Sequence, residues 1–375
     1  MTAPANHAAW LPAGQKPLTV SEAPLTAPGA GEILVRGRAV AINPFDGVVQ
    51  ALGGMITPWV AYPAVLGSDV AGEVVSVGPD VSRFRPGDRV FGLALGIDKV
   101  ANRAAEGAFQ EYVILRQDAT APIPDGIGFE QAAVLPLAVA TAACGLFLPE
   151  QLGLRRPSAA SEQAASKEAV VIWGGATSVG SCAIQLAAAA GYHVVTTASP
   201  KNFSHVRALG ASATFDYADR GVAAKIVDAL RGFELAGVLS IAAGSGAVCI
   251  DIASACPGRR IVAMASAPLP LDDAPLTKQF LWKLSRLPRL AFGFLRLALR
   301  ARMKGVTTRA IWGTALVKGP LGREIFVDFL GPALAEGRFK ATPEPLVAGH
   351  AIGDIPAAMA LLRRGVSARK VVVSL

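Results

Sequence analysis

A strand, a glycine-rich turn and a helix follow one another near the middle of this 375-residue chain, and no other feature constrains the fold as strongly. Residues 169–173 are an apolar, β-branched run, residues 174–180 contain three glycines, and residues 179–190 have a helical pattern. Such a turn lets the backbone approach a ligand closely, and a helix N-terminus offers free N–H groups to an anion. The strand before the turn and the helix after it therefore predict a dinucleotide pyrophosphate site.

The alternation of strands and helices continues after this turn. We expect strands at residues 193–197, 213–216, 237–241 and 260–264, and helices at residues 203–209, 222–230 and 247–255. This pattern is typical of a parallel, doubly wound sheet and predicts a Rossmann domain. Residues 18–120 instead contain short β-rich runs, such as residues 33–40 and 70–77, with few helix-length patterns. A chain of this length is expected to form two domains. The strand–helix alternation predicts one α/β domain, and the short β-rich runs predict a second, β-rich domain.

The glycine-rich turn supplies most of the predicted cofactor contacts. They are Gly174, Gly175, Ala176, Thr177, Ser178, Val179 and Gly180. The central glycine of the usual fingerprint is replaced by Thr177 or Ser178, whose hydroxyl groups could still donate to a phosphate. The strand and helix that flank the turn therefore support this site more than the glycine spacing does.

The residues after the second strand of the α/β domain indicate which nicotinamide dinucleotide binds. An acid there would accept from the ribose hydroxyls of NAD, but Ala198 and Ser199 are followed by Pro200 and Lys201. A serine hydroxyl and a lysine suit a 2′-phosphate, so we expect NADPH. The alternative is that Lys201 is an ordinary solvated lysine. Tyr217, after the third strand, either covers the adenine or reaches the phosphate, or is a plain surface tyrosine.

Several stretches of the chain resemble the medium-chain dehydrogenase/reductase superfamily, in its zinc-independent quinone oxidoreductase and enoyl reductase branch. They are residues 43–46, 66–74, 77–78, 85–90, 107–112, 174–180 and 364–372. The resemblance implies a GroES-like β-barrel domain, formed by residues 1–135 with 341–375, and a Rossmann domain at 136–340, with the active site between them. Residues 199–202 look like the stand-alone enoyl reductases that work alongside polyketide synthases.

The chain departs from zinc alcohol dehydrogenases of this superfamily at the metal positions. Residues 43–46 stand where those enzymes have a zinc-ligating cysteine, and residues 67–69 are Gly-Ser-Asp where they have Gly-His-Glu. A catalytic zinc needs three protein ligands of the Cys, His or carboxylate type, so we expect no catalytic metal. Residues 93–106 contain no cysteine, so the four-cysteine structural lobe is missing too.

Reduction of an enone, an enoyl thioester or a quinone is the expected chemistry, because hydride transfer to such an acceptor needs mainly positioning. By resemblance, Asn43 and Thr141 orient the nicotinamide, Asp46 is a hydrogen-bonding orienter, and Lys370 belongs to the cofactor site. Thr141 could instead bond its own helix backbone. The proton that completes C=C reduction comes from Tyr62, from Lys340 or from water.

A basic segment at residues 278–304 carries the whole excess positive charge. It contains eight Lys and Arg residues and no acid, and the formal net charge of the chain is +8. We expect one or two amphipathic helices there, interrupted at Pro288 and Gly293. The segment contacts an anionic membrane surface, docks an acidic carrier protein or coenzyme A phosphates, caps the substrate cleft, or forms a dimer contact. Nucleic acid is not expected as a partner, because the charge is confined to this one segment.

The remaining expectations concern the location of the protein, its oligomeric state and two alternative functions. Four scattered cysteines and no recognisable signal peptide predict a cytoplasmic enzyme that acts on a small-molecule substrate. The resemblance implies a homodimer, formed through edge strands of the Rossmann sheet near residues 260–264. Two alternative functions stay open. The chain is a zinc-type alcohol dehydrogenase, or it is a catalytically inactive nucleotide-binding or membrane-associated module.

Overall fold

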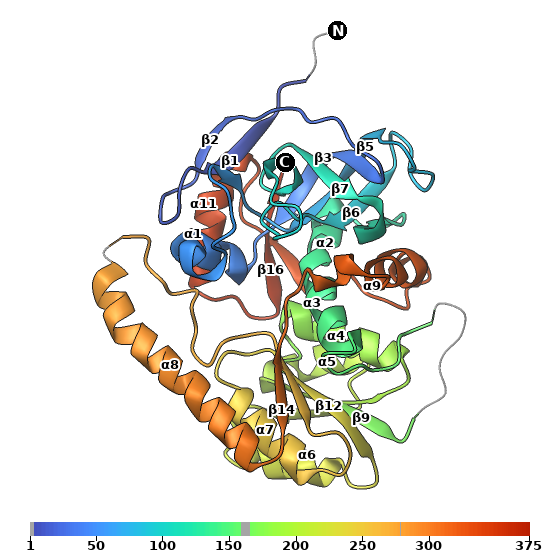
Figure 1. The fold of residues 1–375 in the computed structure, drawn as a ribbon. Coiled ribbons are helices and arrows are strands. Elements are labelled where there is room, and N and C mark those ends of the chain that lie inside the picture. The colour runs from blue at the N-terminus through green and yellow to red at the C-terminus, as the bar shows by residue number, and fades with distance from the viewer. Residues whose placement is uncertain (1–3, 159–165, 278) are drawn as a thin grey trace. The chain divides into compact units, whose positions relative to one another are not determined.

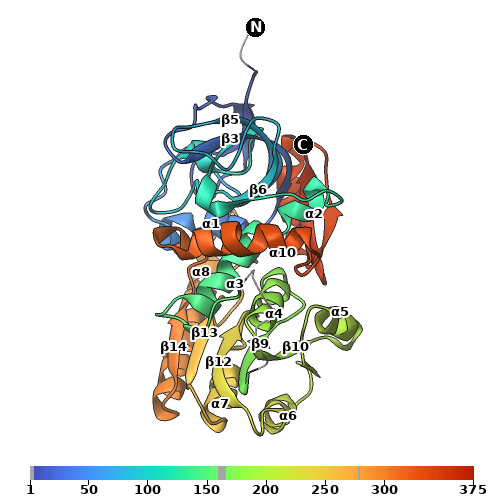
Figure 2. The ribbon, with the colours of Figure 1, turned by 90° about the vertical axis from the view of Figure 1, so that its right-hand side faces the viewer.

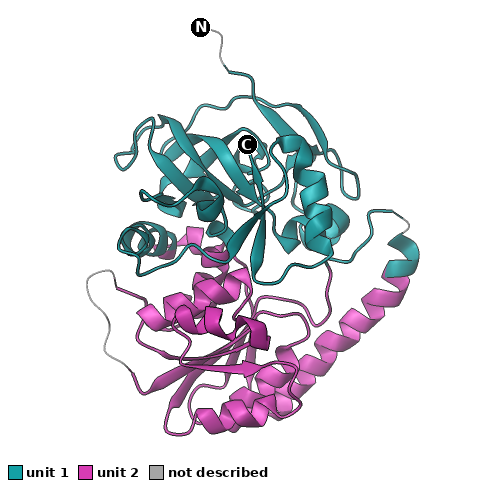
Figure 3. Ribbon diagram, turned by 180° about the vertical axis from the view of Figure 1, so that it is seen from behind, with its two compact units in different colours: residues 1–137, 272–282, 322–375 teal, residues 138–271, 283–321 magenta. Residues whose placement is uncertain are grey.

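The computed structural model describes residues 4–158, 166–277 and 279–375. Residues 159–165 and Lys278, the first residue of the basic segment, lie outside the described residues. The chain forms two compact units (Figure 3). Unit 1 comprises residues 1–137, 272–282 and 322–375, and unit 2 comprises residues 138–271 and 283–321. Helix α3 (Pro136–Phe147) begins at the end of the first segment of unit 1 and continues into unit 2.

Unit 2 contains a six-stranded parallel sheet with the order β11-β10-β9-β12-β13-β14 (Figure 2). Its strands are β9 (Glu168–Trp173), β10 (His193–Ala198), β11 (Ala213–Asp216), β12 (Glu234–Ser240), β13 (Ile261–Met264) and β14 (Thr307–Ala310). Its shorter helices are α4 (Ser178–Ala189), α5 (Phe203–Ala208), α6 (Val222–Ala229) and α7 (Gly246–Ala255). In sequence order the strands read 3-2-1-4-5-6, which confirms the predicted doubly wound Rossmann sheet.

The edge of this sheet differs from the predicted one. Strand β13, at the place expected for the edge, pairs with β12 on one side and with β14 on the other. The edge strand is β14, which follows the basic segment. Its sequence, Thr-Thr-Arg-Ala, is short and largely exposed, so it lacks the apolar run that reveals a buried strand.

Unit 1 is built around β3 (Glu32–Ala41), which pairs with β5 (Asp69–Val77), β7 (Tyr112–Arg116) and β16 (Arg369–Ser374). The same sheet includes β6 (Arg89–Leu93), β8 (Thr120–Pro122) and β15 (Glu344–Val347), and a smaller sheet contains β1 (His7–Leu11), β2 (Thr19–Glu22) and β4 (Ala64–Val65). Strand β16 thus completes the N-terminal sheet, as predicted. Helices α2 (Phe129–Ala133) and α11 (Ile355–Arg363) also belong to unit 1.

Helix α1 (Pro44–Ile56) is a feature of unit 1 that the sequence analysis missed. Its glycines and β-branched residues weaken the helical pattern. A local signal was nevertheless present, because an asparagine, a proline at the first helical position and an acid in the first turn mark a helix start. The carboxylate of Asp46 accepts from the backbone N–H of Asn43 at 2.7 Å and closes this first turn.

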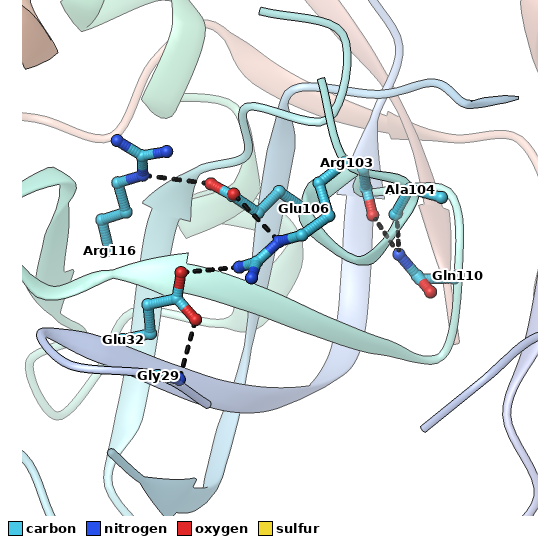
Figure 4. Close-up of polar contacts among 8 residues, drawn as sticks. Gly29, Glu32, Arg103, Ala104, Glu106, Gln110 and Arg116 are labelled. Atoms are coloured by element: carbon cyan, nitrogen blue, oxygen red, sulfur yellow. Dashed lines mark hydrogen bonds and ion pairs between the residues drawn. The ribbon is translucent and has the colours of Figure 1, made fainter. Parts of the chain in front are cut away.

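Ion pairs hold the segment of unit 1 that contains residues 93–106 (Figure 4). Arg103 pairs with Glu32 at 2.6 Å and with Glu106 at 3.2 Å, and Glu106 also pairs with Arg116 at 3.1 Å. The side chain of Glu106 is only 3% exposed, so its charge is compensated by two guanidinium groups. Side-chain charges therefore tie this cysteine-free segment to the neighbouring strands.

Residues 322–340, which the sequence assigned to the Rossmann domain, lie in unit 1. They form α9 (Leu321–Arg323), a π-helical segment (Glu324–Leu330) and α10 (Gly331–Ala335). Arg323 is 3.6 Å from Asp118, and a Cβ on Gly331 would touch the ring of Pro122. This helical region packs against β8 and the turn before it.

The basic segment forms one continuous helix, α8 (Gln279–Met303), so the predicted interruptions at Pro288 and Gly293 are wrong (Figure 1). A proline inside a helix removes one backbone hydrogen bond but need not end the helix when neighbouring turns remain packed. The packing here includes Pro268, whose ring lies against Gly293.

Candidate functional site

The glycine-rich turn in unit 2 has a backbone that only glycine allows at three positions. Gly174 has φ of +99°, in the left-handed region. A Cβ on Gly175 would lie 2.2 Å from the hydroxyl oxygen of Thr196, and a Cβ on Gly180 would lie 2.2 Å from the carbonyl oxygen of Gly174. These close approaches bring the first turn of α4 against the end of β9. The N–H groups of that turn, which have no partner within the helix, are thereby presented at the strand ends.

Two threonines fix the conformation of this turn. The hydroxyl of Thr177 donates to the carbonyl of Gly174 at 2.7 Å and accepts from the N–H of Gly180 at 3.0 Å. The hydroxyl of Thr197, on β10, accepts from the N–H of Gly174 at 3.1 Å. The proton of Thr177 is therefore used within the turn in this structure, and a contact of the Thr177 or Ser178 hydroxyl with a phosphate stays a prediction. Thr177 caps the helix instead.

The register of the parallel sheet places the predicted cofactor residues at one edge. Trp173 pairs with Thr197, and Ala198 pairs with Asp216, so β9, β10 and β11 end side by side. The residues that follow these ends are the glycine-rich turn, Ser199 with Lys201, and Tyr217. Lys201 is exposed, and 53% of the Tyr217 surface is accessible. Ser199 accepts from the side chain of Asn202 at 3.1 Å, which holds the turn after β10.

A buried polar cluster lies in unit 1, where α1 begins and β5 and β16 pass. The side-chain amide of Asn43 donates to Asp69 at 2.8 Å, and the ammonium of Lys370 donates to the amide oxygen of Asn43. Lys370 is also 3.0 Å from Asp69, with side-chain exposures of 5% and 0%. The second carboxylate oxygen of Asp69 accepts from the N–H of Leu137 at 2.6 Å. The buried charges are thus paired and hydrogen-bonded.

Asp46 is fully buried beside this cluster. Burial raises the pKa of Asp46 from 3.8 to about 7; the nearby Asp69 raises it further, while the N–H of Asn43 and the charge of Lys370 oppose the shift. One carboxylate oxygen accepts from Asn43, and the other has no hydrogen-bond partner among the described residues. Near neutral pH this side chain therefore exists in both protonation states.

The other two predicted catalytic residues are not brought into this cluster. The hydroxyl of Tyr62 lies against Gly53, where a Cβ would be 2.7 Å away. Gly53 is seven residues after Asp46 on α1, which separates the two by about 10 Å along the helix axis. Burial raises the pKa of Tyr62, so its hydroxyl keeps its proton. Thr141 is a half-buried residue of α3 in unit 2.

Asp69 is the member of the cluster that the sequence analysis did not select. It was noted only as the last residue of Gly-Ser-Asp, at the position where zinc enzymes have an acid. Its sequence signal is an acid at the start of an apolar strand, where a buried carboxylate requires a partner. The partner, Lys370, is 301 positions away, so sequence spacing could not pair the two.

The comparisons with known proteins give the family. Residues 29–125 match the family described as the alcohol dehydrogenase GroES-like domain. The chain is 44% identical to dehydrogenase pigH of Monascus ruber over 376 residues, which cover 99% of this chain and 100% of that protein. The chain belongs to the medium-chain dehydrogenase/reductase superfamily. It is therefore an oxidoreductase.

Two further members of this superfamily are similar over almost the whole length. The chain is 33% identical to trans-enoyl reductase tndF of Aspergillus flavipes, and the match covers 99% of each chain. The crystal structure of the quinone oxidoreductase of Pseudomonas syringae matches with a TM-score of 0.68 at 22% identity, covering 99% of this chain and 100% of that one. At this identity the structural match shows the shared fold.

The superfamily fold implies that a nicotinamide dinucleotide binds, and the residues of unit 2 fit that group. The glycines let the turn pack closely against β10 and against itself, and the helix N-terminus that it leads into favours a negative charge. The predicted cofactor set thus falls at one edge of unit 2, except Lys370. That residue is paired in unit 1, and its contact with the cofactor stays a prediction.

Proposed function

We propose that this oxidoreductase uses NADPH to reduce an activated C=C bond, in an enone or an enoyl thioester, or a quinone, without a catalytic zinc ion. The observation that carries the proposal is the buried cluster of Asn43, Asp69 and Lys370. Asn43 and Asp69 of this cluster lie in the two stretches, residues 43–46 and 67–69, where zinc-dependent members have metal ligands. The third member is a lysine, and a protonated lysine has no lone pair to donate to a metal. The name of the trans-enoyl reductase relative supports the same chemistry.

The donor set of the described residues does not fit a tetrahedral zinc site. Such a site needs three Cys, His or carboxylate ligands, and no group of three such residues is found among the residues the structure describes. The carboxylate of Asp69 is already engaged by Asn43, Lys370 and Leu137. The chemistry proposed here therefore involves no metal step.

The preference for NADPH rests on the end of β10. No acid follows Ala198, and Ser199 and Lys201 stand at the strand end next to the glycine-rich turn. When bound, NADPH supplies the hydride. The residues of this chain bind the phosphates, orient the acceptor and supply a proton when a C=C bond is reduced. Tyr62, Lys340 and water stay the candidate proton donors; burial raises the pKa of Tyr62, which makes its hydroxyl a weaker acid than an exposed tyrosine.

The test is a fluorescence titration of metal-analysed protein with NADPH and with NADH. Replacing Lys201 by Ala removes a charge-assisted phosphate contact, which should weaken NADPH binding about tenfold to hundredfold. NADH binding should stay unchanged. The matched control is Lys318→Ala, at another exposed lysine of unit 2, which should leave both affinities unchanged.

Consumption of NADPH by the zinc-free protein is then measured with an enone, an enoyl thioester and a quinone. Equal affinities of the wild type for NADPH and NADH would contradict the cofactor assignment. One zinc per chain, with activity lost on chelation, would favour an alcohol dehydrogenase. Tight NADPH binding without turnover of any of these acceptors would favour a binding module.

A further inference from the structure

Helix α8 has an inner face that is packed within unit 2. Arg300 and Lys304 both pair with Asp251 of α7, at 2.5 Å and 2.8 Å. Leu297 lies against Gly246, and Ala301 is only 4% exposed. These contacts fix the rotation of the helix about its axis. The opposite face is therefore held in one orientation.

The outer face of α8 carries an apolar stripe. We define this stripe as Leu281, Leu284, Phe292, Leu295, Leu299 and Met303, whose exposed fractions run from 51% to 80%. At 100° per residue these side chains fall within a sector of about 100°, and they extend for about 33 Å along the helix. With Phe280 and Phe294, α8 holds half of the exposed large hydrophobic residues of the described chain. An apolar surface of this kind indicates a contact with another apolar body.

The charges of α8 have one sign. Residues 279–304 contain seven Lys and Arg residues and no acid. Two of the cations are compensated by Asp251 on the inner face. Arg289 and Arg296 are exposed, lie seven residues apart and follow one border of the stripe, while Arg302 is exposed near its end. The partner of this face must therefore offer an apolar layer and negative charge along the same length.

We infer that α8 lies in the surface of a membrane that contains anionic lipids, with the apolar stripe at the level of the acyl chains and the arginines at the headgroups. An interfacial helix of this type buries its apolar face about 5–10 Å deep and gains from each nearby cation. A second copy of the chain fits less well, because pairing two such stripes would bring arginines of both copies together. A continuous row of exposed side chains on one face of a helix also suits a planar surface.

This arrangement differs from a membrane-spanning helix. Residues 129–147 form the stretch of the described chain that is long and apolar enough to span a bilayer, but 72% of its apolar window is buried within the structure, as in a core helix. In α8 the apolar side chains are exposed and the cations recur along the helix. The helix therefore lies along the surface, where arginines reach the headgroups.

The experiment is co-sedimentation of the full chain with vesicles of phosphatidylcholine alone and with vesicles in which about 30% of the lipid is anionic phosphatidylserine. The wild type should sediment with the anionic vesicles and be released by salt, because the attraction is screened. Replacing Arg289 and Arg296 by Gln should lower the partition coefficient about thirtyfold. Leu295→Ser with Leu299→Ser should lower it by at least about tenfold, since two buried apolar side chains are lost.

Matched controls separate this surface from general effects. Arg85→Gln with Arg231→Gln removes two exposed arginines elsewhere, with side-chain exposures of 88% and 83%, and should leave vesicle binding unchanged. All the substituted residues of α8 are exposed, so the variants should keep the wild-type circular dichroism and NADPH affinity. This readout also keeps the membrane inference separate from the proposed reductase activity.

Three results would overturn the inference. The first is a wild type that stays in the supernatant with anionic vesicles at low salt. The second is a monomer–dimer equilibrium, measured by analytical ultracentrifugation, that Leu295→Ser abolishes while vesicle binding is unaffected. The third is equal vesicle binding by the α8 variants and the wild type, which would place the lipid contact elsewhere.

Discussion

The buried cluster of unit 1 and the strand ends of unit 2 use polar groups in opposite ways. In unit 1, Asn43, Asp69 and Lys370 satisfy one another away from water. In unit 2, the glycine-rich turn and Lys201 stand at an open edge, where N–H groups and a charge can meet a ligand. Charge in the buried cluster of unit 1 should therefore stabilise the fold, whereas charge at the strand ends of unit 2 should affect ligand binding and hardly change stability.

The largest expected effect comes from breaking the buried ion pair. Lys370→Met leaves the carboxylate of Asp69 buried without its cation and should lower the free energy of unfolding by about 3–5 kcal/mol. The double variant Asp69→Asn with Lys370→Met should recover much of this loss, because no charge is then left unpaired. Urea denaturation measures both values. The control is Glu73→Gln in the exposed Arg38–Glu73 pair, where the loss should stay below about 1 kcal/mol.

The second effect concerns Asp46 and pH. Because the folded-state pKa of Asp46 is about 7 and its ordinary value is 3.8, the folded chain binds the proton more tightly than the unfolded chain. The stabilisation is fully present below about pH 4 and is lost as the pH rises to about 7, with a total near 4 kcal/mol. Asp46→Asn should remove this part of the pH dependence. If the free energy of unfolding changes with pH in the same way in both proteins from pH 4 to 8, the raised pKa of Asp46 is contradicted.

The third effect is in the glycine-rich turn. Gly180→Ala places a Cβ against the carbonyl of Gly174, so the turn must shift. We expect the free energy of unfolding to fall by about 1–3 kcal/mol. The fractional loss of NADPH affinity should be larger than the fractional loss of stability, because the turn itself is predicted to contact the cofactor. The control is Gly319→Ala, where no atom lies within 4 Å of the new Cβ. Thermal unfolding and NADPH titration are measured together. Unchanged NADPH affinity in Gly180→Ala would show that the backbone approach at this turn is not used for the cofactor.

The smallest effect comes from the helix cap. Thr177→Ala removes the acceptor for the N–H of Gly180 and should lower the free energy of unfolding by about 1 kcal/mol. Thr177→Ser keeps the hydroxyl and should restore the stability. A loss of NADPH affinity in Thr177→Ala that Thr177→Ser does not restore would mean that the methyl group, and not the cap, matters to the ligand.

The Rossmann unit could be predicted closely because its signals are local. The expected strand at residues 213–216 is β11, and the glycine-rich turn lies between β9 and α4 as predicted. Helix α1 was missed because its glycines and β-branched residues obscure a helical pattern, although its cap was present in the sequence. The edge strand β14 was missed because its exposed residues give no apolar run.

The sequence by itself determined the alternation of strands and helices from β9 to β13, the glycine-rich turn and the absence of an acid after β10, because each depends on neighbouring residues and on the period of apolar positions. Tertiary structure alone decided which distant groups meet. Lys370 pairs with Asp69 because β16 returns beside β3, and β3 in turn pairs with β5, which begins at Asp69. Tertiary packing also kept α8 unbroken through Pro288 and set which of its faces is exposed. These outcomes depend on contacts between residues far apart in the chain, and local sequence carries no record of them.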